Sequence, residues 1–144
     1  KNEYQLTTAL RNLSNIGEKF TTIEVRDWLD CGTPKKLIET NTYLLKNHRY
    51  KQFFVSSKKD TKSQIIEPVY IGKNVIIKNS KIGPNVSIED NCIIEKTNIK
   101  NTIIHENVVI KNGSLENSIL GKFSNYNNKS KSIIIGPYSN LNRK

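Results

Sequence analysis

The sequence predicts a mainly β protein, in which a parallel β-helix follows a small α/β segment. From Ile65 onward, Ile or Leu recurs every five or six residues. The first fifty residues instead combine a helical period with one β-branched stretch, and a polar stretch follows them. We therefore expect an α/β segment over residues 1–50, a linker over 51–63 and a β-helix domain over 64–144.

A helix and a strand are expected first. Between residues 4 and 15, apolar side chains including Leu6 and Leu13 fall on one helical face, and Gly17 ends that helix. The stretch Thr21–Val25 is β-branched and alternates, which is typical of a strand.

A second helix is expected after the loop WLDCGTP. Thr33 supplies an N-cap hydroxyl and Pro34 suits the first helical position. The helix should end near Asn47. Its buried face is expected to consist of Leu37, Ile38, Leu44 and Leu45.

The repeat in the second half has the form of a hexapeptide repeat, with three steps in each coil of a triangular prism. Each large apolar residue should point inward and stack on its counterpart one coil away. An ordinary β-sandwich is the alternative, but sandwiches lack a fixed six-residue register. The inward residues are Ile65, Ile71, Ile77, Ile82, Ile88, Ile94, Ile99, Ile104, Ile110, Leu115 and Leu120.

The corners of the prism should also be visible in the sequence. Four positions after each large residue, a smaller residue should point inward. The residue directly before this smaller one should turn the chain with positive φ, which Asn tolerates. The expected small inward residues are Val75, Val86, Cys92 and Val108, and the expected corner residues are Asn74, Asn85, Asn91 and Asn107.

Composition limits the possible partners. The formal charge is +10, but no basic run exceeds two residues and no aromatic side chains alternate with the lysines, so we expect no nucleic-acid partner. No run of about 18 apolar residues exists, so we expect no membrane span. Cys31 and Cys92 form neither a disulfide framework nor a CxxC pair, which favours a reducing cytoplasm.

The segments EYQLTTALRNL and KFTTIEVRDWLDCGTPKKLIETNTYLL, followed by hexapeptides, resemble the C-terminal part of sugar-phosphate nucleotidyltransferases. The resemblance is to the glucose-1-phosphate thymidylyltransferase group with a β-helix tail. It implies a Rossmann-like catalytic domain followed by a left-handed β-helix, with residues 1–50 as the C-terminal edge of the catalytic domain. The implied reaction joins an NTP to a sugar 1-phosphate and releases pyrophosphate.

The same resemblance implies that Asp30, in the motif W-x-D-x-G-T-P, is a ligand of Mg²⁺. The chemistry suits this role, because two anionic substrates must be neutralised and aligned, and Mg²⁺ prefers one or two carboxylates with phosphate oxygens. From the residues alone, a turn-capping role for Asp30 is the alternative.

The glycine-rich nucleotide loop of the family is absent from this sequence, as is any Met. We therefore expect the chain to be the C-terminal part of a longer enzyme, inactive alone, whose β-helix forms a homodimer or homotrimer.

The runner-up function is an acyl-CoA-dependent acyltransferase with the outward His105 as its base. His48 suits the end of a helix. Cys31 is expected to be an inert thiol and Cys92 a core residue.

Overall fold

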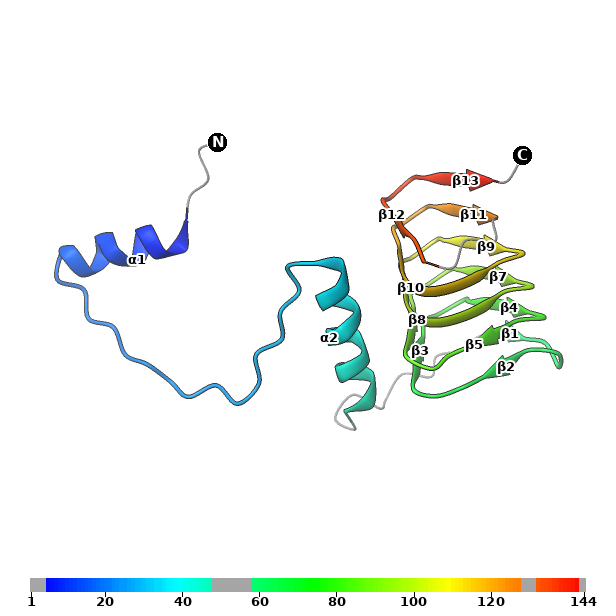
Figure 1. The fold of residues 1–144 in the computed structure, drawn as a ribbon, viewed down its shortest axis with the longest axis horizontal. Helices are drawn as coiled ribbons and strands as arrows, with labels where there is room; N and C mark the ends of the chain where they lie inside the picture. The colour runs from blue at the N-terminus through cyan, green and yellow to red at the C-terminus, as the bar shows by residue number, and fades with distance from the viewer. Residues whose placement is uncertain (1–4, 48–57, 128–131, 143–144) are drawn as a thin grey trace.

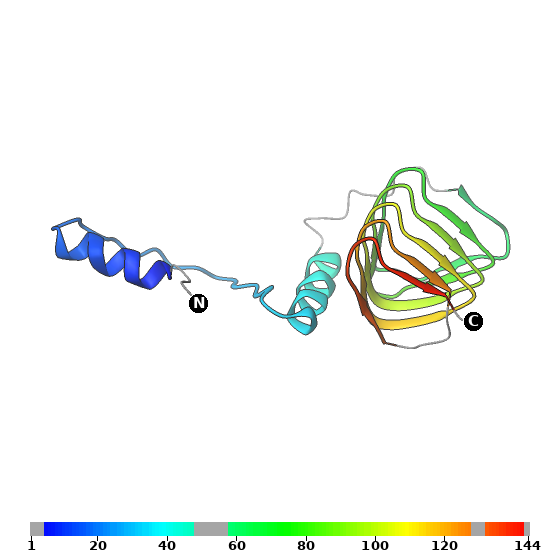
Figure 2. The ribbon, with the colours of Figure 1, turned by 90° about the horizontal axis from the view of Figure 1, so that it is seen from above.

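The computed structural model describes residues 5–47, 58–127 and 132–142. In these ranges, two helices precede a parallel β-solenoid of about five turns (Figure 1). Helix α1 (Leu6–Asn15) lies apart from the solenoid, and helix α2 (Pro34–Lys46) lies against its side (Figures 1 and 2). Neither helix is long and apolar enough to cross a membrane.

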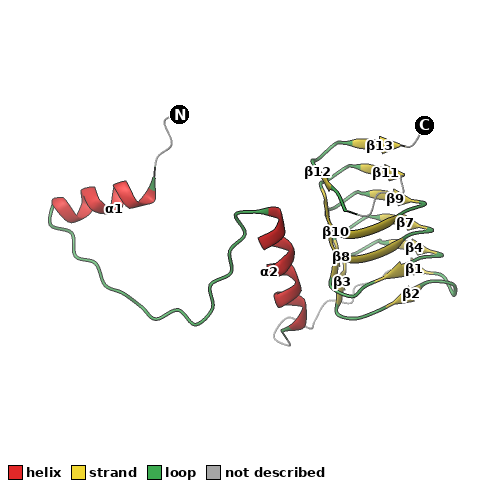
Figure 3. Cartoon of the chain, in the orientation of Figure 1, coloured by secondary structure: helices red, strands yellow, loops and turns green. Residues whose placement is uncertain are grey.

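One sheet forms a complete face of the solenoid, and all its pairs are parallel (Figure 3). Its strands come from successive coils, as the repeat predicts. They are β1 (Lys58–Lys59), β4 (Ile76–Lys78), β7 (Ile93–Glu95), β9 (Val109–Lys111), β11 (Asn125–Asn127) and β13 (Asn140–Asn142).

The second sheet bends around a corner and supplies the other two faces. Strands β8 (Asn98–Ile104) and β10 (Ser114–Leu120) span both faces, and Asn101 and Asn117 turn the chain within them at φ 46° and 50°. Before the corner they follow β2 (Gln64–Ile65) and β5 (Lys81–Ile82). After it they align with β3 (Val69–Ile71), β6 (Val86–Ile88) and β12 (Ile134–Ile135).

The expected apolar column is confirmed. Ile71, Ile88, Ile104 and Leu120 pair in register, and each is at most 1% exposed. Because each coil alone buries almost nothing, the stacking of these side chains is the main source of stability. The smaller inward residues predicted at 75, 86, 92 and 108 are fully buried as well.

The corners also follow the prediction. Asn74, Asn85, Asn91 and Asn107 adopt left-handed conformations with φ between 56° and 60°. Their side chains form short ladders along the stack, for example from Asn74 Nδ2 to Asn91 Oδ1 at 3.1 Å. A left-handed backbone is less strained for Asn than for most residues, so Asn marks the turns.

The structure of the N-terminal segment agrees with the sequence prediction only in part. Helix α1 forms, and Gly17 follows it at φ 91°, but its apolar side chains are exposed, with Leu6 at 74%. The strand predicted for Thr21–Val25 is wrong, because this stretch has no regular secondary structure. A strand needs a hydrogen-bonded neighbour, and the described residues offer none here.

The solenoid begins earlier than the expected boundary at residue 64. Of the segment expected to be a linker, residues 51–57 lie outside the described part of the chain, as does His48. Lys58 and Lys59 pair with Ile76 and Ile77, so they already belong to the stack. The polar composition suggested a linker, but the backbone of β1 pairs with β4 at the end of the described sheet.

Candidate functional site

The loop that carries Asp30 is held by two hydrogen bonds, one within the loop and one from helix α2. Gly32 N–H donates to Asp30 Oδ1 at 2.7 Å, and Thr40 Oγ1 donates to the Asp30 carbonyl at 3.0 Å. Gly32 does not need a left-handed conformation, but a Cβ there would lie 3.1 Å from Oδ1. The glycine therefore leaves room for the tight turn through its small size, and the Asp30 carboxylate remains exposed.

Helix α2 starts as the sequence predicts. Thr33 is the N-cap, its Oγ1 accepts from Lys36 N–H at 3.3 Å, and Pro34 occupies the first turn. Thr40 is buried at 9% exposure because it faces the loop that it holds. The hydrogen bond from Thr40 thus fixes the Asp30 backbone to the body of the helix.

An open hollow of about 460 Å³ lies beside this loop. Asp30 and Glu39 supply its carboxylates, while Lys36 forms an ion pair with Glu39 at 3.2 Å. Trp28, 87% exposed, and Tyr43, 39% exposed, line the same hollow and supply apolar surface. The hollow could take a planar group or a cation, since it combines aromatic side chains with two carboxylates and one lysine that is already paired.

Helix α2 connects this loop to the solenoid by packing on β8 and β10. Ser87 Oγ donates to Asn41 Oδ1 at 2.6 Å. Ile103 and Ile119 share the outward column of Ser87, yet each is only 8% exposed. Burying two such side chains under the helix contributes about 1.5 to 3 kcal/mol each, so α2 is held firmly.

Asp30 fits the part of a magnesium site that one carboxylate can supply. One oxygen is oriented by Gly32 N–H, and the exposed carboxylate leaves the other accessible. Within the described ranges, no group of three or more His, Cys, Asp or Glu side chains could hold a metal ion. Any metal at Asp30 would therefore need ligands from substrate phosphates or from outside these ranges.

The side chain of His105 forms a bridge between two coils. Its Nδ1 lies 3.1 Å from Glu89 Oε1, and Glu89 Oε2 accepts from Glu106 N–H at 3.0 Å. Next to it, the Glu106 carboxylate hydrogen-bonds Lys122 at 2.9 Å and raises the pKa of that ammonium. A ring oriented by a carboxylate has the arrangement of a general base, and the same contacts also serve to join the coils.

The expected core position of Cys92 is confirmed, whereas the expectation that Cys31 is inert stays a prediction about catalysis. Cys31 is exposed, whereas Cys92 is buried and its Sγ donates to the His105 carbonyl at 3.1 Å. Burial raises the pKa of the Cys92 thiol to about 11, because a thiolate is poorly solvated in the core.

Iodoacetamide at pH 8 should therefore modify Cys31 at least ~100-fold faster than Cys92, because only about one Cys92 thiol in a thousand is ionised at that pH. Intact mass should show one adduct in the native chain and two after denaturation. Cys31→Ser serves as the control and should remove the fast adduct. Equal labelling of both thiols in the native chain would contradict the buried position of Cys92.

A scan against models of known protein families finds no match for this chain, and a search of curated proteins finds no matching relative.

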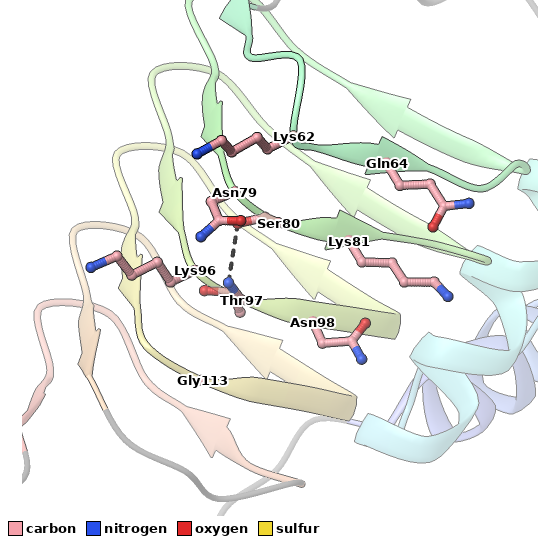
Figure 4. Close-up of a pocket in the computed structure, with 9 residues that line it drawn as sticks. All are labelled: Lys62, Gln64, Asn79, Ser80, Lys81, Lys96, Thr97, Asn98 and Gly113. Atoms are coloured by element: carbon pink, nitrogen blue, oxygen red, sulfur yellow. Dashed lines mark hydrogen bonds between the residues drawn. The ribbon is translucent and has the colours of Figure 1, made fainter.

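Sequence reasoning missed a lysine-lined groove on one corner of the solenoid (Figure 4). Its signal is present in the repeat, since aligning the stretches KNSK (residues 78–81) and EKTN (95–98) places polar and basic residues at matching positions. Sequence reasoning also missed the Asn41–Ser87 contact, which no periodicity indicates.

Proposed function

We propose that this chain is the C-terminal part of a cytoplasmic sugar-1-phosphate nucleotidyltransferase with a left-handed β-helix tail. The enzyme would join an NTP, such as dTTP, to a sugar 1-phosphate and release pyrophosphate. The observation that supports this most is the Trp28–Pro34 loop, whose exposed carboxylate is fixed at the start of a helix that is itself fixed to a β-solenoid.

In this proposal Asp30 provides one carboxylate for Mg²⁺. When bound, Mg²⁺ would supply charge neutralisation between the two anionic substrates. Gly32 N–H orients the carboxylate and Thr40 holds the loop backbone, so little reorganisation is required when a substrate binds. The groups that bind the nucleotide would lie outside this sequence, because it contains no glycine-rich loop.

The activity is tested with the longer protein that contains this chain. With dTTP, glucose 1-phosphate and Mg²⁺, that protein should release pyrophosphate, and the 144-residue chain alone should release none. If the longer protein releases no pyrophosphate with any NTP and sugar 1-phosphate pair, the proposal fails.

We also infer that the solenoid assembles copies of the chain. Ile76, Ile93 and Val109 form an outward column on the complete sheet, in register and only half-buried. Beside this column, Glu95 lies 3.6 Å from Lys78 and from Lys111. A flat apolar strip bordered by charges is suited to packing on a second copy.

Sedimentation at micromolar concentration should therefore show a dimer or trimer of the 16.5 kDa chain. Ile93→Lys should shift the species toward the monomer, because a charge in the middle of the strip cannot be desolvated cheaply. Ile23→Lys is the control, since Ile23 is 83% exposed and far from the solenoid in sequence. A single 16.5 kDa species for the unmodified chain would refute the assembly.

A further inference from the structure

One corner of the solenoid carries an open groove of about 460 Å³ that the proposed reaction does not use. It lies where strands β4 and β7 of the complete sheet turn toward β5 and β8 (Figure 4). Lys62, Lys81 and Lys96 line it, together with the side-chain amides of Asn79 and Asn98. The groove therefore combines ammonium groups with neutral hydrogen-bond donors.

The three lysines keep their charge available. Within the described ranges, none of them has a carboxylate within ion-pair distance. The neighbouring carboxylates are already engaged. Asp60 accepts from the Ser63 hydroxyl, which lowers the pKa of Asp60, and from Asn79 N–H at 3.0 Å. Glu95 is shared between two lysines outside the groove.

Lys96 has a backbone conformation that does not suit lysine. Its φ is 51°, and the residues at the matching corner positions one coil before and after are Asn79 at 47° and Asn112 at 53°. Asn is better tolerated in this left-handed region than a long side chain such as lysine. A strained residue in place of an unstrained one points to a role for its side chain.

The floor of the groove is rigid. Ser80 Oγ donates to the Lys78 carbonyl at 2.8 Å and accepts from Thr97 N–H at 3.1 Å. Thr97 Oγ1 donates to the Glu95 carbonyl at 2.8 Å. These buried hydroxyls hold the coils together, so recognition is left to the lysines and amides above them.

The spacing of the charges indicates the size of the ligand. Lys62 and Lys96 occupy matching positions two coils apart, so their backbones are about 10 Å apart. A chain of phosphates matches this spacing with one lysine beside each phosphate group, whereas a single phosphate would require the two side chains to converge on it. No aromatic side chain lines the groove, so it lacks the stacking surface that single-stranded nucleic acids use.

We propose that this groove binds the phosphate chain of a small polyphosphorylated ligand. Lys62, Lys81 and Lys96 neutralise the chain, and the amides of Asn79 and Asn98 donate to its oxygens. The proposal is independent of the nucleotidyl-transfer function, because it uses no residue of the Asp30 loop.

Calorimetric titration of the 144-residue chain with inorganic tripolyphosphate at low salt tests it. Lys96→Asn should weaken binding at least ~10-fold, since it removes one of the three charges that neutralise the phosphate chain. The same variant should melt no lower than the original chain, because Asn suits a φ of 51°. Lys96→Arg keeps the charge and should bind within about threefold of the original chain.

Lys73→Asn is the matched control, because it removes the same charge from the preceding corner of the solenoid and leaves the groove intact. It should change the affinity less than about twofold. If Lys73→Asn and Lys96→Asn lower the affinity for tripolyphosphate equally, or if the original chain does not bind tripolyphosphate, the proposal is overturned.

Parallel titrations with ADP and CoA distinguish the sources of the phosphate chain. If ADP or CoA binds with the same sensitivity to Lys96→Asn, the groove takes the diphosphate of a nucleotide. If only tripolyphosphate binds with this sensitivity, the groove takes a free polyphosphate. Both results support a polyphosphate site, and CoA binding would also favour the acyltransferase alternative.

Discussion

Replacing Ile88 with Asn should lower the free energy of unfolding by about 4 kcal/mol or more. Ile88 is fully buried between Ile71 and Ile104 in the central column. The substitution removes a branched apolar side chain and places an amide where the stacked neighbours are hydrocarbon. Since the total free energy of unfolding of a domain is about 5 to 15 kcal/mol, the substitution would remove a large part of it. Urea unfolding followed by far-UV circular dichroism measures the change.

Ile134→Asn is the matched control for this experiment. Ile134 lies on β12, beside the inward Ile135 that continues the same column, but it points outward and is 60% exposed. The same chemical change should therefore cost less than about 1 kcal/mol there. Similar urea midpoints of unfolding for the Ile88→Asn variant and the original chain would contradict the stacked core.

Asp30→Asn should reduce turnover at least a hundredfold in the longer protein that contains this chain. Losing one charge-stabilising contact of this kind costs about 3 to 4 kcal/mol in the transition state. The amide oxygen of Asn can still accept the Gly32 N–H, so the loop should keep its shape. The loss of turnover then reports the missing negative charge, which Mg²⁺ requires. Pyrophosphate release from dTTP and glucose 1-phosphate measures it.

Asp27→Asn separates this effect from a general loss of charge near the loop. Asp27 is exposed and lies three residues before Asp30. Its replacement should leave turnover within about twofold, because it belongs to neither the turn nor the hollow. If Asp30→Asn stays within threefold of the parent, Asp30 is a turn cap and not a metal ligand.

The solenoid core could be predicted from the sequence because its determinants are local and repeated. An inward Ile or Leu recurs at each step, and the Asn residues mark the corners at which φ is positive. Each coil repeats the same requirement, so the pattern of one coil predicts its neighbours. The start of helix α2 was predictable for a similar reason, since Thr33 and Pro34 act within one turn.

The strand predicted for Thr21–Val25 shows where local signals fail. Its β-branched residues have strand propensity, but propensity cannot supply the neighbouring strand that a ladder requires. The described residues provide no such neighbour, and Ile23 and Val25 remain exposed.

The surfaces depend on how distant segments meet. The adjacent residues Ile103 and Ile104 look alike in the sequence, yet Ile104 stacks in the core and Ile103 is covered from outside by α2. That covering depends on the docking of the helix, to which the bond between Asn41 and Ser87 contributes across 46 residues of chain. The hexapeptide pattern thus determines which side chains point inward, because inward packing repeats from coil to coil. The docking of α2 on an outer face is decided only by the tertiary structure, because its contacts join positions that have no fixed spacing along the chain. The lysines of the groove recur at matching positions of the repeat, but their charges come together only when the coils stack.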